Sequence, residues 1–325
     1  MTVSSEGTPD PFTAWVASLR HGLPYERRAA AVTLGRAGDV RAVPVLCQAL
    51  HDQDERVRTA AIEGLVRAGL VSAWPLCDVF QDAETPACEG AMIALLGIGE
   101  AATAVLCAAL DAPQHKIREG AATVLGRLRD QQAVPALCAG LGDRAPEVRI
   151  AVAASLAQIA DPAALPALVH VLAQVDHRTR QAAADALVTF GAVAVPVLIG
   201  ALADSNRLVR GAAAYSLGRI GDSNAVAVLG EALADSGRWV RLAAARALGR
   251  IGSRRAAASL RRRLHPLNHD RERDPEVVRA IRIALHQIKG TPSLSEDQLP
   301  IPSGPPELDP AQLPLPGDAP TAAAD

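Results

Sequence analysis

The stretch "VRGAAAYSLGRIGDSNAVAVLGEALADS" (residues 209–236) nearly repeats itself in the residues that follow, "VRLAAARALGRIGSRRAAASLRRRL" (240–264). Val209, Arg210, Leu217, Gly218, Ile220 and Gly221 recur in the second copy, whereas other positions change. Self-similarity at a fixed period of 20 to 50 residues is typical of solenoid proteins. We therefore followed the period along the chain.

The arginine of the "VR" pair defines the period. It recurs at Arg58, Arg118, Arg149, Arg180, Arg210 and Arg241, in steps of one or two periods of 30 or 31 residues. The register extends back to Arg27, passes through a degenerate unit at Cys88, and continues to a ninth unit at residues 274–290.

Each unit predicts two helices. The first is short and apolar, as in residues 133–141, and the second has apolar positions at three- and four-residue spacing and ends at glycine. Asp204 or Asn206 is expected to cap the helix that begins before Val209. A helix pair cannot bury its own apolar face, so neighbouring pairs must stack. We predict an all-α fold, a right-handed α-solenoid of about eight to nine helix pairs.

The expected organisation has three parts. An N-terminal segment and capping helix occupy 1–23, the repeat array occupies 24–290, and a disordered, acidic, proline-rich tail occupies 291–325. Aromatic residues make up only 2% of the chain although 49% of it is hydrophobic, which indicates a core of small, closely packed side chains.

The unit "D…VRxxAAxxLGxIGDxxAVPxLxxAL" resembles the HEAT-like repeat first described in phycobilisome lyases, from about Tyr25 to Gly290. The resemblance implies a helical array and a bacterial protein, but a fold does not define an activity. With no secretory signal in the first residues, we expect a cytoplasmic location.

Two enzyme families share this repeat. Deoxyhypusine hydroxylases bind two irons through His-Glu pairs, and none of the eight histidines here is followed by glutamate. A bilin-lyase-like or other enzyme role stays open because such lyases offer no short motif to test. We predict no catalytic residue, metal or cofactor, since no nucleophile or phosphate-loop motif is present.

Two features of the array have structural explanations. Cys47, Cys77, Cys107 and Cys138 recur once per unit, so we expect reduced core thiols and not a disulfide or metal site. Residues 91–110 have a single charge and membrane-spanning length, but they follow the repeat phase, so we expect two short buried helices and no membrane association.

The variable positions of the second helices carry the functional prediction, because these helices line the concave surface of HEAT-like stacks. We expect the invariant arginines to bond the turn of a neighbouring unit. The variable residues of two adjacent units form an arginine- and aromatic-rich candidate binding site: Arg207, Leu208, Tyr215, Arg219, Arg238, Trp239, Leu242, Arg246 and Arg250.

Charge is unevenly distributed along the chain. The net charge is −6 over residues 1–205, +10 over 206–290 and −6 over 291–325. We therefore predict a non-enzymatic interaction scaffold that binds an acidic or extended segment of a protein partner in the groove of the C-terminal repeats. The acidic tail is expected to compete for this groove. Nucleic-acid backbone binding is the other alternative, opposed by the acidic first 205 residues.

Overall fold

The computed structural model describes residues 10–82, 85–174, 176–265, 268 and 271–289. Eighteen α-helices and six 3₁₀ turns, with no strand, make up these described residues. The predicted tail, 291–325, lies outside them. The prediction of an all-α solenoid is confirmed.

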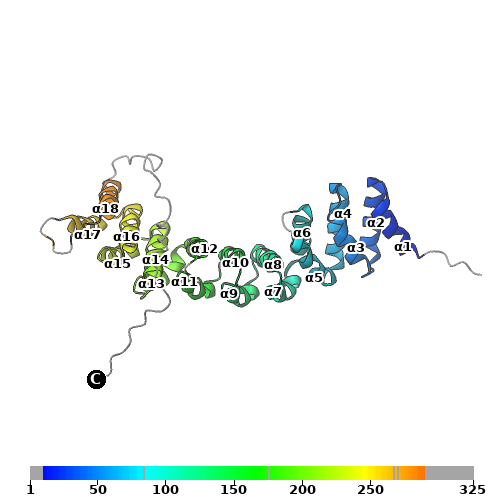
Figure 1. Ribbon diagram of the computed structural model, residues 1–325, viewed down its shortest axis with the longest axis horizontal. Coiled ribbons are helices and arrows are strands. Elements are labelled where there is room, and N and C mark those ends of the chain that lie inside the picture. Colours follow the sequence, from blue (N-terminus) through cyan, green and yellow to red (C-terminus); the bar gives the residue numbers. More distant parts are fainter. Residues whose placement is uncertain (1–9, 83–84, 175, 266–267, 269–270, 290–325) are drawn as a thin grey trace, which may run out of the picture.

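The helices form nine pairs stacked in chain order (Figure 1). The first helices of the pairs are α1 (Pro11–His21), α3 (Ala42–Ala49), α5 (Leu70–Val79), α7 (Thr103–Ala109), α9 (Val134–Gly140), α11 (Leu165–Val171), α13 (Val195–Ala201), α15 (Val226–Ala232) and α17 (Ala256–Leu264). The second helices are α2 (Pro24–Ala37), α4 (Glu55–Ala68), α6 (Pro86–Ile98), α8 (His115–Leu128), α10 (Pro146–Ile159), α12 (His177–Thr189), α14 (Arg207–Ile220), α16 (Arg238–Ile251) and α18 (Pro275–Ile288). The predicted capping helix is α1, which packs on α2 and so completes the first pair.

The two helix sets form separate rows. Even-numbered helices line the inner side of a shallow arc and odd-numbered helices from α3 to α17 line its outer side (Figure 1). Alanine and leucine fill the buried core between the rows, as the scarcity of aromatic residues predicts. The even-numbered row therefore presents the surface on which the candidate residues lie.

The local signals act as the sequence indicates. The Asn206 side chain accepts a hydrogen bond from the Leu208 amide at 2.9 Å and caps α14, whereas Asp204 accepts from the Asn206 amide at 2.7 Å and shapes the turn. At the other end Gly221 has φ of 80°, a left-handed conformation that glycine adopts without strain. Asn206 is therefore the cap of this helix, and Asp204 is not.

One described helical stretch, Pro86–Ala109, is apolar and long enough to cross a membrane, with a mean hydropathy of 1.9. Helices α12 and α13 with the turn between them would qualify only as one span bent by 117°. Pro86–Ala109 consists of α6, a 3₁₀ turn and α7, and the break falls at Gly99, whose φ is 74°. The prediction of two short helices in repeat phase is confirmed, but only 33% of the apolar window is buried, so the expectation that they are buried holds only in part.

The four cysteines that recur once per unit lie at the same position of α3, α5, α7 and α9, and all are free thiols. Cys47 and Cys77 are buried, and burial raises the pKa of each thiol to about 12. Cys107 and Cys138 are only partly buried, so the expectation of a fully buried ladder is wrong for these two.

Candidate protein-interaction surface

Most of the recurring arginines link their second helix to the turn of the next unit: Arg27, Arg118, Arg149, Arg210 and Arg241. Arg210 donates through Nε and Nη2 to both carboxylate oxygens of Asp235 in the next turn, at 2.6 and 2.9 Å. Its Nη1 donates to the Asp204 and Ser205 carbonyls of its own turn, at 2.8 and 2.9 Å. One guanidinium thus links two successive turns. The predicted stacking role is confirmed for the five arginines with such ion pairs, whereas Arg58 bonds only carbonyls of its own turn in the described residues.

The same arrangement holds α16 against the last pair. Arg241 donates through Nε to Glu272 at 2.7 Å and through Nη1 to the Asp235 carbonyl at 3.0 Å. Glu272 comes from the longer connection between α17 and α18, and its side chain is only 3% exposed. These arginines are occupied by the stack and are unavailable to a partner.

The nine predicted site residues all lie on α14 and α16, which pack against each other. We call them the C-terminal stripe. Its five arginines are exposed and its four apolar or aromatic residues are partly buried: Arg207, Arg219, Arg238, Arg246 and Arg250, with Leu208, Tyr215, Trp239 and Leu242. The structure therefore brings the whole predicted set onto two adjacent helices.

Trp239 has a structural contact that the sequence did not indicate. Its indole covers Gly211 of α14 so closely that a Cβ built at Gly211 would lie 1.9 Å from the Trp239 ring. The glycine that varies between repeats is therefore where the neighbouring tryptophan packs. Trp239 stabilises the α14–α16 interface and exposes only part of its ring.

Arg219 is held within the array. Its Nη1 donates to the Tyr215 hydroxyl and to an Asp185 carboxylate oxygen of α12, each at 3.0 Å. The hydrogen bond to Tyr215 and then the nearby negative charge raise the pKa of Arg219. The pair Tyr215 and Arg219 thus forms a polar link between α12 and α14.

Arg238 also has partners within the array. Its Nε lies 2.6 Å from Asp274, and its Nη2 lies 2.6 Å from Glu276 of α18. These ion pairs are partly exposed, and exposed pairs contribute only about 0–1 kcal/mol each. A partner carboxylate can therefore exchange with them at small cost.

Arg246 and Arg250 differ from the other arginines of the stripe. They lie one helical turn apart on α16, and within the described part of the chain neither guanidinium has an ion pair or hydrogen bond. Desolvation lowers the pKa of Arg246, the charge of Arg250 lowers it further, and Glu276 opposes them. Two adjacent cations whose guanidiniums have no ion pair or hydrogen bond in the described residues form an anion-binding surface.

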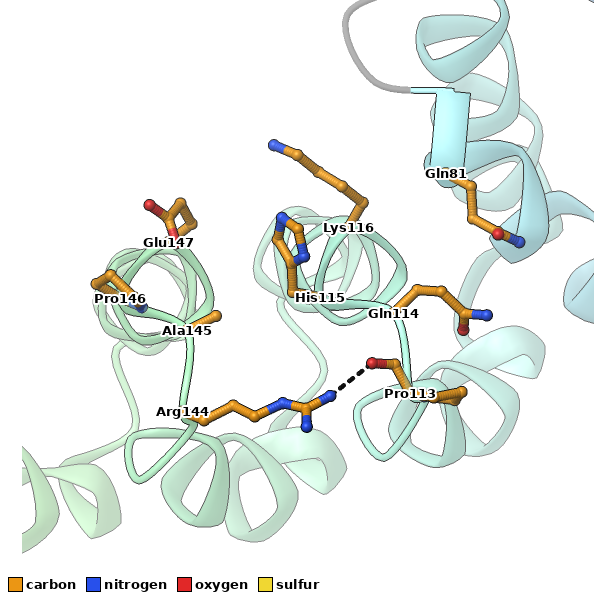
Figure 2. A pocket seen from close by; sticks show the side chains of 9 residues that line it. All are labelled: Gln81, Pro113, Gln114, His115, Lys116, Arg144, Ala145, Pro146 and Glu147. Carbon is orange, nitrogen blue, oxygen red and sulfur yellow. Dashed lines mark hydrogen bonds between the residues drawn. The ribbon is translucent and has the colours of Figure 1, made fainter.

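Sequence reasoning missed an open hollow of about 660 Å³ at the starts of α8 and α10 (Figure 2). His115, Lys116 and Glu147 project at its rim, and Arg144 donates to the Pro113 carbonyl at 2.7 Å across its floor. Pro113 and Arg144 lie 31 residues apart, one period, so the register would have placed them together. Its mixed charges indicate no particular ligand.

No group of three or more metal-ligating side chains occurs among the residues that the structure describes. Protein-family models and solved structures resemble this chain in its fold. A protein-family model for HEAT repeats matches residues 12–97, 103–188 and 195–286. The chain belongs to the HEAT-repeat family. No curated protein matches this HEAT-repeat chain.

Solved structures resemble the fold at low sequence identity. A mutant of Kap121p has a TM-score of 0.53 at 15% identity, covering 89% of this chain and 34% of that one. Importin beta has a TM-score of 0.50 at 16% identity, covering 86% of this chain and 41% of the other. Human deoxyhypusine hydroxylase is 21% identical over 80% of this chain and 100% of its own, with a TM-score of 0.32. The chain thus spans less than half the length of the two importin-type solenoids.

Proposed function

We propose that this HEAT-repeat chain is a non-enzymatic interaction scaffold that binds an acidic or extended protein segment along the C-terminal stripe. Stacked repeats produce the extended concave surfaces on which solenoid proteins bind partners. The observation that carries the proposal is the pair Arg246 and Arg250, exposed on α16 with no ion pair or hydrogen bond to either guanidinium in the described residues.

The rest of the stripe suits a peptide with mixed chemistry. Leu242 and Tyr215 are partly buried and offer apolar area beside the cations. Trp239 is fixed on Gly211, so a ligand that contacts its exposed edge meets a preorganised ring. Arg207 extends the cationic surface at the start of α14. Negatively charged groups of a partner would bind the arginines, and its apolar groups would contact Leu242, Tyr215 and Trp239.

Several finer features belong to the same proposal. The repeat type is that of the phycobilisome lyases, because the units contain the pattern "VRxxAAxxLGxIG". The proposed location is the cytoplasm, and the five free thiols support it because disulfides are rare there. Protein is the proposed partner class, and nucleic acid is an outcome of the test below.

The test is affinity capture from a nuclease-treated bacterial lysate by the full chain, compared with the variant R246E/R250E. We expect at least about tenfold less partner on the variant, because reversing two charges replaces attraction by repulsion. The matched control is R36E/R127E, since Arg36 and Arg127 are exposed and occupy the repeat position of Arg250 in α2 and α8.

Equal capture by wild type and R246E/R250E would overturn the stripe as the binding site. A salt-dependent gel shift of nucleic acid by the wild type that R246E/R250E abolishes would assign the surface to nucleic acid instead. Circular dichroism checks that each variant retains its helices.

A further inference from the structure

The last helix pair differs from the others at the positions that face the next unit. In α14, Gly211 contacts Trp239 and Gly218 contacts Ala247 of the following helix. In α16, Gly249 contacts Ala284 in the same way. Ala284 of α18 therefore corresponds to Ala247 of α16, which is a shift of 37 residues.

This register assigns charges to the outer side of α18. The stacking positions Leu242 and Ala245 of α16 correspond to Arg279 and Arg282 of α18. Ala245 is buried beneath the next unit, whereas Arg279 and Arg282 are exposed. Helix α18 thus has arginines where α16 has Leu242 and Ala245 and α14 has Gly211 and Ala214.

The first helix of the last pair follows the same rule. The position after the buried leucine is Cys47, Cys77, Cys107 and Cys138 in the early units, then Val169, Ile199 and Gly230. Gly230 faces the next unit, where a Cβ would lie 2.9 Å from the Ser259 hydroxyl. In α17 this position is Arg261, which is exposed.

We call Arg261, Arg279 and Arg282 the end face. In the described residues none of the three guanidiniums has an ion pair or hydrogen bond. An open hollow of about 540 Å³ lies beside Arg261 and is lined by Ala258, Arg261, Arg262, His265 and Asn268. The end of the array is therefore a cationic surface with a recess.

We propose that residues 291–325 of the same chain dock on this end face. The segment has six acidic residues, nine prolines and no lysine or arginine. It begins three residues after Ile288, where α18 ends. The charge distribution along the sequence predicts that this acidic segment docks somewhere on the basic C-terminal repeats. The arginines of the end face, which have no ion pair or hydrogen bond in the described residues, narrow the docking site to the end of the array.

The chain length permits the contact. Arg279 lies nine residues before Ile288, or about 14 Å along the helix. Glu296 and Asp297 follow Ile288 by eight and nine residues, which span up to about 30 Å when extended. The linker is therefore long enough for the first acidic pair to meet both arginines of α18, and "PPELDPAQLPLP" (305–316) follows on a still longer tether.

Tethering favours this occupant over a second copy of the chain. A segment joined by a short linker has an effective concentration of about millimolar, so weak ion pairs suffice to keep it bound. Two end faces from different copies would repel each other because both are cationic. The proposal concerns a surface separate from the C-terminal stripe, so it can fail while the proposed function holds.

The test is cleavage of the tail in the full chain by thermolysin, which cuts beside the leucines of residues 294–315. We expect the wild-type tail to be cleaved about fivefold more slowly than the tail of R261E/R279E/R282E, and the protection to disappear at high salt. The control R246E/R250E reverses two charges on the C-terminal stripe and none on the end face. It should retain the protection of the tail from cleavage.

A charge swap distinguishes the loss of ion pairs from a general destabilisation of the end-face variant. Combining R279E/R282E with E296K/D297K should restore slow cleavage, because the ion pairs re-form with opposite sign. Equal cleavage rates for wild type and the end-face variant would overturn the proposal, and so would a swap that restores nothing.

Discussion

At the scale of single residues, the stack depends on arginines that each bridge two turns. Arg118 is the most enclosed of them: its side chain is 5% exposed and that of its partner Asp143 is 10% exposed. It donates to both Asp143 oxygens, at 2.6 and 2.8 Å, and to the carbonyls of Ala112 and Pro113. Two carboxylate oxygens and two backbone carbonyls thus accept hydrogen bonds from one side chain.

We predict that Arg118→Ala lowers the free energy of unfolding by about 3 kcal/mol, because it leaves a buried carboxylate unpaired. Urea denaturation measures the loss. Arg127→Ala on the exposed side of the same helix should change stability by less than about 0.5 kcal/mol. A similar small effect for both variants would contradict the bridging role.

A second prediction concerns pH. The hydrogen bond from the Thr179 hydroxyl, followed by backbone amides and Arg149, lowers the pKa of Asp176 to about 2 from its ordinary 3.8. The depressed value stabilises the fold above about pH 4, and this stabilisation is lost as the pH falls from 4 towards 2.

Asp176→Asn should therefore cost about 1 kcal/mol at pH 7, after solvent screening of this partly exposed group, and about a third of that at pH 2.5. Thermal denaturation of wild type and variant across this pH range measures the difference. A difference that does not change with pH would show that Asp176 acts through its shape and not its charge.

At the scale of helices, close approach is set by glycine. Gly211 leaves the space that the Trp239 ring fills, so α14 and α16 can pack with a large aromatic residue between them. Gly200 in α13 has nothing within 4 Å of an added Cβ. The same residue type is therefore essential at one position and dispensable at another.

We predict that Gly211→Ala destabilises the protein by about 1–3 kcal/mol, because the new methyl group displaces the indole. Gly200→Ala should stabilise it by about 0.5–1 kcal/mol through the higher helix propensity of alanine. Denaturation of the two variants checks both signs. Trp239 fluorescence should also shift in Gly211→Ala and stay unchanged in Gly200→Ala.

At the scale of the whole molecule, the arginine ladder has a gap. The register places Cys88 where an arginine is expected. It also places Ala83 where the carboxylate partner of Arg58 would be, and Pro113 where the partner of an arginine at position 88 would be. Arg58 bonds the Asp52 and Gln53 carbonyls of its own turn and has no ion pair in the described residues. Around α6 the array is held by apolar packing, such as Phe80 against Gly120, without these bridges.

Because a solenoid unfolds locally, we predict that α6 opens at a free energy at least about 1 kcal/mol below that of α8, α10, α14 and α16. Native-state hydrogen exchange measures each unit. Arg210→Ala should lower the opening free energy at α14 and α16 and leave α6 unchanged. A single common value for all units would contradict a gap in the ladder.

The sequence by itself determined the stack. The 30- or 31-residue period, the anchor arginines and the apolar spacing predict about eight to nine stacked helix pairs, because contacts in a solenoid are between sequence neighbours. It also selected two adjacent helices for the candidate site. Only the tertiary structure decided which arginines are occupied: Arg219 and Arg238 look as variable as Arg246 and Arg250, yet the first two have carboxylate partners. Those partners, Asp185, Asp274 and Glu276, belong to other units, and side-chain geometry between units decides which charges meet.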